Sequence, residues 1–440
     1  MNKLFTYVMA VFASLLPSFA AAQEAVGFDE RINQIFADYT GWYVSFIFAP
    51  LPGTNFSWIA LWLVVGAVVF TVYFGAIQVK GFWHSIQLVR GDYSDPDDAG
   101  EVSHFQALAT ALSGTVGLGN IAGVAVAVSI GGPGATFWMV VAGLFGMATK
   151  FTECTLGVKY RNEFPDGHVS GGPMYYIVKG FAERGLPLGG FMAVLFSIFT
   201  ILGALGGGNM FQANQAHAQL AGVLGDYPGW ITGVILAGVT FAVIAGGLKS
   251  IARVTEKIVP FMGVFYVLVS VLILIINWDM IGWAFGQIFM GAFTGLGVVG
   301  GFTGALIQGF RRAAFSNEAG IGSAAIAHSA VRTKEPVTEG YVALLEPFID
   351  TVVICTMTAL VIVISGVLNQ DPETGLYIWN AEAGRIATEG EVSGVALTSA
   401  AYARAFSWFP ILLMIAVVLF AFSTMISWSY YGLKGWTYLV

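Results

Sequence analysis

The chain has 440 residues, of which 57% are hydrophobic and only 10% are charged, and its formal net charge is −7. Soluble domains carry about a quarter charged residues, so this composition excludes an ordinary globular enzyme. Proline is sparse and no low-complexity repeat occurs, which argues against disorder. We therefore expect an all-α polytopic membrane protein whose main partner is the lipid bilayer.

The first residues, 1–22, are typical of a cleavable secretory signal: Lys3 precedes an apolar stretch that ends in three alanines. An uncleaved first span is the alternative. In residues 23–56, apolar side chains recur at helical spacing from Phe28 to Tyr39. This spacing predicts a periplasmic amphipathic segment that lies on the outward-facing surface of the membrane that the protein spans.

From Ser57 onward the chain is a series of apolar runs, each close to the length that a bilayer requires. If the first run crosses inward, every basic residue after the signal except Arg31, Arg385 and Arg404 falls on the cytoplasmic side. This asymmetry predicts that the mature N-terminus lies outside the cell and the C-terminus inside. The expected spans are 57–79, 104–129, 134–157, 189–222, 230–247, 258–277, 297–325, 341–367 and 406–431.

The stretch "SGTVGLGNIAG", residues 113–123, fits the spacing of a dinucleotide-binding turn. Such a turn needs an acidic residue about 20 positions later, yet no Asp or Glu occurs between Glu101 and Glu153. The nucleotide interpretation therefore fails. The glycines serve either close helix packing or an unwound helix whose backbone groups line a polar cavity, and the residues alone leave both open.

The sequence shows no convergent set of side chains for catalysis or for a resident metal. The five histidines are scattered, and the two cysteines lie in apolar runs without metal-ligand spacing. We expect no enzyme activity, no organic cofactor, no nucleic-acid partner and no obligate protein partner.

Charged residues inside or near the spans are candidate gating or coupling groups. Asp350 falls well inside a span, where a carboxylate is costly and by default functional. It is expected to tune an ion site or to anchor a cytoplasmic gate with Arg311 or Arg312. Glu318 is grouped with these candidate gating or coupling charges. Glu318 and Glu153 lie nearer the cytoplasmic face, where ion pairing is the expected role of both.

Several long motifs carry a family resemblance. The segments "GTVGLGNIAGVAVAVSIGGPGATFWM", "RRAAFSNEAGIGSAAIAHSA" and "EPFIDTVVICTMTALVI" resemble the alanine or glycine:cation symporter family. The resemblance implies a LeuT-type fold of ten core helices in two inverted repeats, with discontinuous first and sixth helices. Residues 57–79 would be an extra helix, 104–277 the first repeat and 297–431 core helices six to eight. Because family members continue beyond "YYG", the last core helices are expected to be lacking, as in a truncated sequence.

The resemblance also implies a substrate site at the broken helix. By position, Leu118 and Gly119 match backbone donors for the carboxylate of an amino acid. Asn120 is assigned to substrate, to a sodium ion or to holding the unwound backbone, and these alternatives stay open. In the third core helix Asn209 and Gln212 share a face and are expected to bind polar groups of the substrate. The remaining candidates are Thr424 and Trp428, which share a face of the eighth core helix, and Phe302 and Thr303 in the expected break at 299–305.

A sodium site is implied between the first and eighth core helices. Its expected ligands are the carbonyls of Ser113, Val116 and Phe420 and the hydroxyls of Ser423 and Thr424. The resemblance therefore implies a sodium-coupled symporter that imports small neutral amino acids, alanine or glycine, by alternating access. A proton-coupled transporter with Asp350 as the titrating group is the first alternative, and a gated channel is the second.

Overall fold

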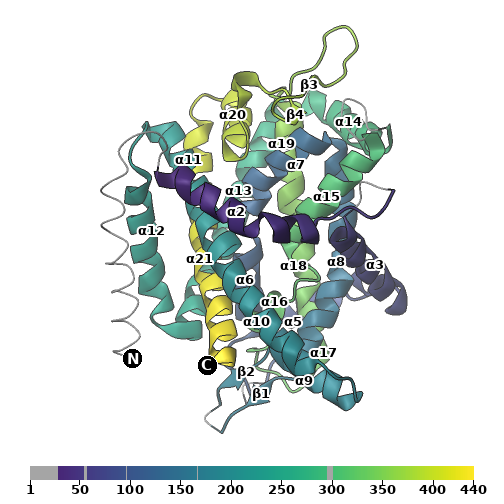
Figure 1. The fold of residues 1–440 in the computed structure, drawn as a ribbon, viewed down its shortest axis with the longest axis vertical. Helices are drawn as coiled ribbons and strands as arrows, with labels where there is room; N and C mark the ends of the chain where they lie inside the picture. The colour runs from purple at the N-terminus through teal and green to yellow at the C-terminus, as the bar shows by residue number, and fades with distance from the viewer. Residues whose placement is uncertain (1–27, 54–56, 96, 166, 295–300) are drawn as a thin grey trace. The chain divides into compact units, whose positions relative to one another are not determined.

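A computed structural model describes residues 28–53, 57–95, 97–165, 167–294 and 301–440. It consists of two compact units, residues 1–59 and 60–440, and each unit is described by itself. The expected signal segment, 1–22, lies outside the described residues. Figure 1 shows the order of the elements by colour.

The first unit contains α2 (Phe28–Ile47), in the region where the apolar spacing predicts an amphipathic helix. Its end is fixed by Trp58, whose Nε1 donates a hydrogen bond to the Phe46 carbonyl over 2.8 Å. Tyr39 and Trp42 are exposed. The helix is confirmed, while its place on a membrane surface stays a prediction.

The second unit is built almost entirely of helices. Its first half contains α3 (Trp58–Tyr73), which begins at the unit boundary, α4 (Ile77–Lys80), α5 (Phe82–Arg90), α6 (His104–Thr115), η1 (Gly119–Gly123), α7 (Val124–Gly131), α8 (Gly134–Lys159), α9 (Pro173–Glu183), α10 (Gly189–Leu205), η2 (Gly206–Met210), α11 (Phe211–Leu224), α12 (Gly229–Ile244) and α13 (Gly247–Ile276). Its second half contains η3 (Trp278–Met280), α14 (Ile281–Thr294), α15 (Gly301–Asn317), α16 (Ala324–His328), α17 (Pro336–Ala343), α18 (Leu345–Pro347), η4 (Phe348–Cys355), α19 (Thr356–Ile364), η5 (Glu389–Glu391), α20 (Val395–Ala405) and α21 (Phe409–Leu439).

The strands of the described chain are short and lie in the connections between helices. β1 (Asn162–Glu163) pairs antiparallel with β2 (Val169–Ser170), with Asn162 opposite Ser170. β3 (Trp379–Asn380) pairs antiparallel with β4 (Arg385–Ile386), with Trp379 opposite Ile386. Neither pair forms part of a larger sheet.

Five helical stretches of the described chain are long and apolar enough to cross a membrane, and the bent pair α6–α7 makes a sixth. The predicted spans near 104–129, 134–157, 189–222, 341–367 and 406–431 correspond to such stretches. α13 begins at Gly247, well before the predicted start at 258. The membrane-protein class is therefore confirmed.

The predicted spans differ from the observed helices in three places. α14 was not predicted, because its 14 residues are too few for a straight crossing of the bilayer. The run 297–325 is not one span, since α15 ends at Asn317 and a separate helix begins at Ala324. The break expected at 299–305 is also misplaced: residues 301–305 lie within α15, and 299–300 lie outside the described residues.

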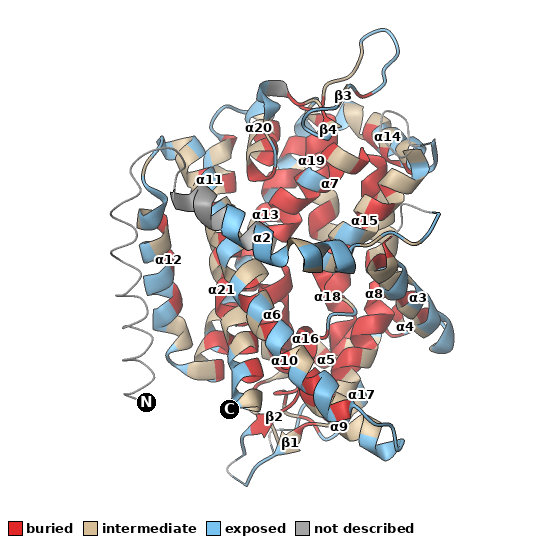
Figure 2. Ribbon diagram, viewed as in Figure 1, coloured by how far each residue is buried: buried red, intermediate tan, exposed pale blue. Residues whose placement is uncertain are grey.

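Burial separates inner helices from outer ones. In Figure 2, α8 and α19 are largely buried, whereas α12 is mostly exposed. The exposed side chains of α12 include Val234, Ile235 and Phe241. Apolar side chains that face outward on an apolar helix suit contact with lipid rather than water.

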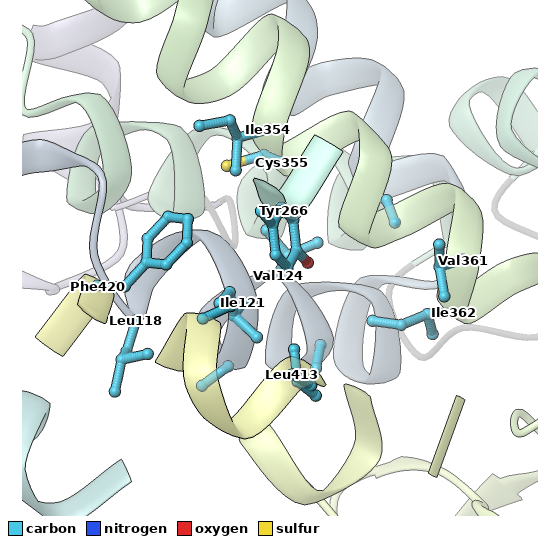
Figure 3. Packing of buried hydrophobic residues seen from close by; sticks show 14 of the residues in the cluster. Leu118, Ile121, Val124, Tyr266, Ile354, Cys355, Val361, Ile362, Leu413 and Phe420 are labelled. Atoms are coloured by element: carbon cyan, nitrogen blue, oxygen red, sulfur yellow. The ribbon is translucent and has the colours of Figure 1, made fainter. Parts of the chain in front are cut away.

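The core packs around the interrupted segment between α6 and α7. Figure 3 shows Leu118, Ile121 and Val124 of this segment among buried side chains that include Tyr266 and Phe420. The Tyr266 ring lies 5.5 Å from the Phe420 ring, and its hydroxyl is 2.6 Å from Thr358 Oγ1. The irregular backbone is thus enclosed by protein, as irregular backbone at membrane depth requires.

Candidate functional site

The helix that begins at His104 is interrupted where its glycines cluster. A capping box between Ser103 and Gln106 starts α6, which ends at Thr115. Val116 leaves the helical conformation with ψ 85°, and the helix resumes at Gly119 in a direction bent by 51°. The unwound-helix interpretation of residues 113–123 is therefore confirmed.

Gln212 of α11 holds the break from one side. Its Oε1 accepts a hydrogen bond from the Leu118 amide at 3.0 Å, and its Nε2 donates to the Gly207 carbonyl at 2.9 Å. The Leu118 amide, expected to bind a carboxylate, is thus already engaged by a side chain 94 positions away in sequence. Sequence reasoning could not find this contact, because it depends on how two helices pack.

A cavity of about 400 Å³ opens beside the break. Four predicted site residues line it, namely Gly119, Gln212, Thr424 and Trp428, and so does Glu318, which was assigned to gating. Its other walls include Gly117, Phe196, Phe199, Phe315, Ile321 and Ser323. Backbone, amide, hydroxyl and carboxylate groups therefore meet apolar and aromatic walls, which is the composition of a small-molecule site.

Trp428 and Glu318 form one wall of this cavity. Trp428 Nε1 donates to Glu318 Oε1 at 3.2 Å, and Ser323 Oγ donates to the other carboxylate oxygen. Glu318 has φ +58°, the left-handed conformation that a non-glycine residue seldom adopts. Ion pairing was expected for Glu318, but within the described residues no cationic side chain lies within 4 Å of it.

Thr424 contributes a free hydroxyl to the cavity. It is 2% exposed, yet the described residues provide no hydrogen-bond partner for its Oγ1. A buried hydroxyl without a partner is costly, and such groups call for an explanation such as a ligand. Thr424 is therefore well placed to receive one.

Asn120 holds the unwound backbone and does not line the cavity. Its Oδ1 accepts from the Gly117 amide at 2.9 Å, and its Nδ2 donates to Asp350 Oδ1 at 2.5 Å. Its carbonyl accepts from Thr358 Oγ1 at 2.8 Å. Of the alternatives for Asn120, these contacts support the structural one.

Asp350 of η4 is fully buried and lies directly behind the break. Its Oδ2 accepts from Ser316 Oγ at 2.8 Å and from Thr351 Oγ1 at 2.7 Å. Neutral donors thus surround this carboxylate, and they tie η4 to α15 and, through Asn120, to η1.

The arginine partners expected for Asp350 lie elsewhere. Arg311 is exposed. The Arg312 guanidinium lies 4.4 Å from the centre of the Phe315 ring and packs against Gly119 and Gly123, where an added Cβ would overlap it. Among the described residues no ion pair within 4 Å joins Arg312 to Asp350, and Arg312 Nε and Nη2 have no hydrogen-bond partner. The gate between these charges is not formed in this conformation.

The residues of the expected sodium site come from α6, from Val116 directly after it, and from α21, and the two helices lie together. Ser113 Oγ donates to the Ser423 carbonyl at 2.6 Å, and Ser423 Oγ donates to the Phe420 carbonyl at 3.0 Å. These groups are buried, as are Val116 and Thr424. The Ser423 hydroxyl thus bonds back to a carbonyl of its own helix, and sodium binding at the predicted positions stays a prediction.

The remaining substrate candidates do not reach the cavity. Asn209 Nδ2 donates to the Ala204 carbonyl of its own helix at 2.7 Å, inside the π-helical turn η2. Phe302, in the first turn of α15, packs edge-on against Trp138 of α8. Neither Phe302 nor Thr303 lines the cavity. The glycines around Phe302 mark the start of a helix: Gly301 has φ +57°.

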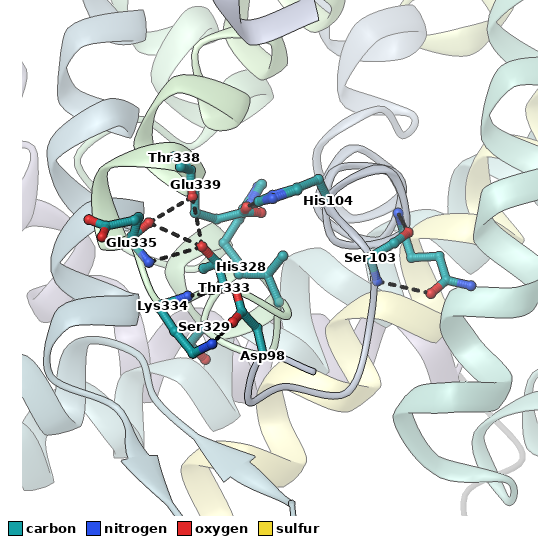
Figure 4. Close-up of polar contacts among 12 residues, drawn as sticks. Asp98, Ser103, His104, His328, Ser329, Thr333, Lys334, Glu335, Thr338 and Glu339 are labelled. Atoms are coloured by element: carbon teal, nitrogen blue, oxygen red, sulfur yellow. Dashed lines mark hydrogen bonds and ion pairs between the residues drawn. The ribbon is translucent and has the colours of Figure 1, made fainter. Parts of the chain in front are cut away.

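A chain of buried ionisable side chains was missed by sequence reasoning. His104, Glu339, His328, Glu346 and Lys150 follow one another in contact, and Figure 4 shows Glu339 with both histidines. His104 and Glu339 are 235 positions apart in the sequence, and no local signal joins them. The absence of histidine motifs was therefore no evidence against a histidine cluster.

Two further features complete the charged interior. Glu153 was expected to form an ion pair, but its Oε1 accepts the Gly320 amide at 2.6 Å. Cys154, His328 and Glu346 are the described residues whose ligand atoms lie close enough to share a metal ion. Both ring nitrogens of His328 already contact carboxylates, so we assign no metal to this group.

Comparison with known proteins places this geometry in context. The profile of the sodium:alanine symporter family matches residues 43–440. The sodium/alanine symporter AgcS of Methanococcus maripaludis is 42% identical over 380 residues, which cover 86% of this chain and 80% of that protein. An uncharacterised transporter of Haemophilus influenzae is 38% identical, covering 79% of this chain and 72% of its own length. The amino-acid carrier protein AlsT of Bacillus subtilis is 33% identical, with 86% and 76% covered.

Proposed function

We propose, from the premise that the chain belongs to the sodium:alanine symporter family, that it couples the import of alanine or glycine to sodium. Membership makes the chain a multi-pass, cation-coupled amino-acid symporter. The identity of the ion and the small neutral substrate are our proposals. They are supported by the family match, by the Ser113–Ser423 hydrogen bond that joins α6 to α21, and by the cavity beside the break.

The observation that carries the substrate proposal is the wall chemistry of this cavity. The segment η1–α7 begins at Gly119, so the positive end of its dipole faces the space and suits a carboxylate. Glu318 and the unpartnered Thr424 hydroxyl offer oxygens to an ammonium group. Because Trp428 occupies one wall, we propose that only a small side chain fits beside it.

We assign sodium to the oxygens of Ser113, Val116, Phe420, Ser423 and Thr424. Sodium is a hard cation that prefers oxygen, and carbonyls of an unwound turn can supply oxygen without a carboxylate. In the present structure the Ser423 hydroxyl donates to one of these carbonyls, that of Phe420. Sodium binding would use the Ser423 and Phe420 oxygens together, so the site would form with a local rearrangement of the Ser423 hydroxyl.

We also propose how the elements divide for alternating access. α6–α13 would form the first repeat, α15–α21 would belong to the second repeat, and α3 would be an extra helix, as in a LeuT-type transporter. The interruption between α15 and α16, which includes Glu318, would be the counterpart of the break between α6 and η1. The N-terminal side of the mature chain would lie outside the bacterial inner membrane and its C-terminal side inside.

Equilibrium binding to the purified protein tests the site without requiring transport. Labelled alanine is titrated in detergent with sodium chloride or with potassium chloride at equal ionic strength. The proposal predicts saturable binding in sodium that falls at least tenfold in potassium, and competition by glycine. Equal binding in both salts would contradict the sodium proposal, and no binding in either salt would contradict the substrate proposal.

A further inference from the structure

The chain of buried ionisable groups behind α6 has a protonation state that its geometry defines. His328 Nδ1 lies 2.5 Å from Glu339 Oε1, and its Nε2 lies 2.5 Å from Glu346 Oε1. At the two ends, His104 Nδ1 lies 2.5 Å from Glu339 Oε2, and Lys150 Nζ lies 3.3 Å from Glu346 Oε2. All five side chains are 0–3% exposed, so they are shielded from bulk solvent.

Both ring nitrogens of His328 face acceptors. A neutral imidazole has one N–H and one lone pair, and an ionised carboxylate has no proton to give. A neutral ring between two carboxylates would therefore leave a nitrogen lone pair 2.5 Å from a carboxylate oxygen, in a site shielded from bulk solvent. One extra proton must be held between these three side chains.

Two flanking groups decide where that proton resides. His104 donates to Glu339, and Lys150 faces Glu346, so each carboxylate has its own support for the negative form. With His328 as imidazolium, the charges of Lys150 and His328 balance those of the two glutamates. Without the proton the buried cluster would carry an uncompensated negative charge, which is costly.

The other titratable side chains that face the cluster favour the same state. They are Glu153 and Cys154 of α8, Glu318 before α16, and Tyr431 of α21. Each is either neutral or negative, so none can replace His328 as the cation between the glutamates. Glu153 and Glu318 accept hydrogen bonds from other donors, as described above.

We propose that His328, clamped between Glu339 and Glu346, is a buried proton-binding site that holds its proton at a pH where a histidine in water is neutral. The site is assembled from α6, α8, α16, α17 and α18. A conformational change that separated α16 from α17 or α18 would remove one of the two acceptors and release the proton. Proton binding is thereby linked to the packing of these helices, whether or not the transported ion is sodium.

Nitrogen NMR of the ¹⁵N-histidine-labelled full chain in detergent tests this site directly. The spectrum is taken near pH 8.5, about two units above the ordinary histidine pKa of about 6.5, with the urea-unfolded chain as the control. We expect one of the five histidines to show both ring nitrogens protonated in the folded chain, and none in the unfolded one. Five neutral rings in the folded chain would overturn the proposal, and this outcome needs no variant.

Two substitutions assign the signal. Loss of the cationic signal in His328→Gln and its retention in His104→Gln would support the assignment, whereas the reverse pattern would overturn it. Glu346→Gln removes one acceptor charge and is expected to convert His328 to the neutral form at the same pH. Glu163→Gln is the matched control, because Glu163 is half exposed and pairs only with Arg161 among the described residues. A cationic His328 that survives Glu346→Gln would contradict the clamp.

Discussion

At the scale of single residues, buried polar groups explain how a broken helix is tolerated inside a membrane protein. Asn120 satisfies the Gly117 amide and reaches Asp350, and Gln212 satisfies the Leu118 amide. Each contact replaces a hydrogen bond that a continuous helix would have made for itself. The residues nearest the break therefore serve partly to hold the backbone and partly to line the cavity.

Asp350→Asn is expected to impair transport at least tenfold at a fixed sodium concentration. The substitution removes a charged acceptor from Asn120, Ser316 and Thr351, and hydrogen bonds to charged groups contribute about 1.5–3 kcal/mol each. Sodium-dependent alanine uptake in vesicles measures the effect. Asp226→Asn, which changes an exposed loop carboxylate, is the control and should transport normally. Normal sodium-dependent uptake by Asp350→Asn would refute a coupling role for this carboxylate.

Trp428→Phe is expected to weaken alanine uptake and to admit larger neutral amino acids. The smaller ring enlarges the cavity and removes the hydrogen-bond donor to Glu318. We expect KM for alanine to rise on the order of tenfold. Competition of labelled alanine uptake by unlabelled leucine measures the specificity. Trp436→Phe changes an exposed ring on the same helix and should leave both quantities unchanged. Identical competition profiles for the two variants would show that Trp428 does not limit substrate size.

Asp98 and Lys334 form an ion pair in the connections outside the spans, where both groups can exchange protons with the solvent. Lys334 Nζ lies 2.6 Å from Asp98 Oδ1, and its hydrogen bond lowers the pKa of Asp98 below the ordinary value. The pair therefore stabilises the folded chain above the unfolded aspartate pKa of about 3.9, and this stability is lost as pH falls through the lower folded pKa.

Asp98→Asn should accordingly lower the melting temperature slightly at pH 7 and by less near pH 3. Thermal unfolding of the two proteins in detergent at both pH values provides the comparison. A difference that grows on acidification would have the wrong sign for this ion pair.

At the scale of elements, the interruption of α6 at residues 113–123 could be predicted from the sequence, but the second interruption could not be placed. The glycines of 113–123 coincide with a real break, whereas those near 299–305 coincide with the start of α15. Glycine permits both features, and only the tertiary contacts select one. α14 was missed because it is shorter than a membrane crossing, and the amphipathic α2 was found because its apolar spacing is helical.

Gly117→Ala tests the need for close packing at the break. A Cβ at this position would overlap Thr424 Oγ1 and lie 3.1 Å from Gln212 Oε1, both on the cavity wall. We expect alanine binding to fall at least tenfold, because overpacking costs about 1–3 kcal/mol and here displaces site residues.

Gly222→Ala is the matched control, since a Cβ at this position in α11 would meet no atom within 4 Å. Its melting temperature should stay the same or rise, because alanine favours helix over glycine by about 1 kcal/mol. Equal alanine binding by the Gly117 and Gly222 variants would contradict the proposed site.

At the scale of the whole molecule, contacts between helices that are distant in sequence create features that no local sequence pattern predicts. The His104–Glu339–His328–Glu346–Lys150 chain and the Glu318 side of the cavity both depend on packing between segments far apart in the sequence. Composition and motifs were enough to predict the membrane class, the family and the position of the first break. They could not predict which amides and carboxylates would already have partners.

The proposal that the chain is a sodium-coupled symporter is tested most directly by gradient-driven uptake in reconstituted vesicles. Labelled alanine is supplied outside, and inward gradients of sodium, potassium or protons are imposed separately at equal osmolarity. We predict transient accumulation above equilibrium with the sodium gradient alone, abolished when an ionophore dissipates it. Accumulation that is indifferent to sodium, or that follows the proton gradient instead, would contradict sodium coupling.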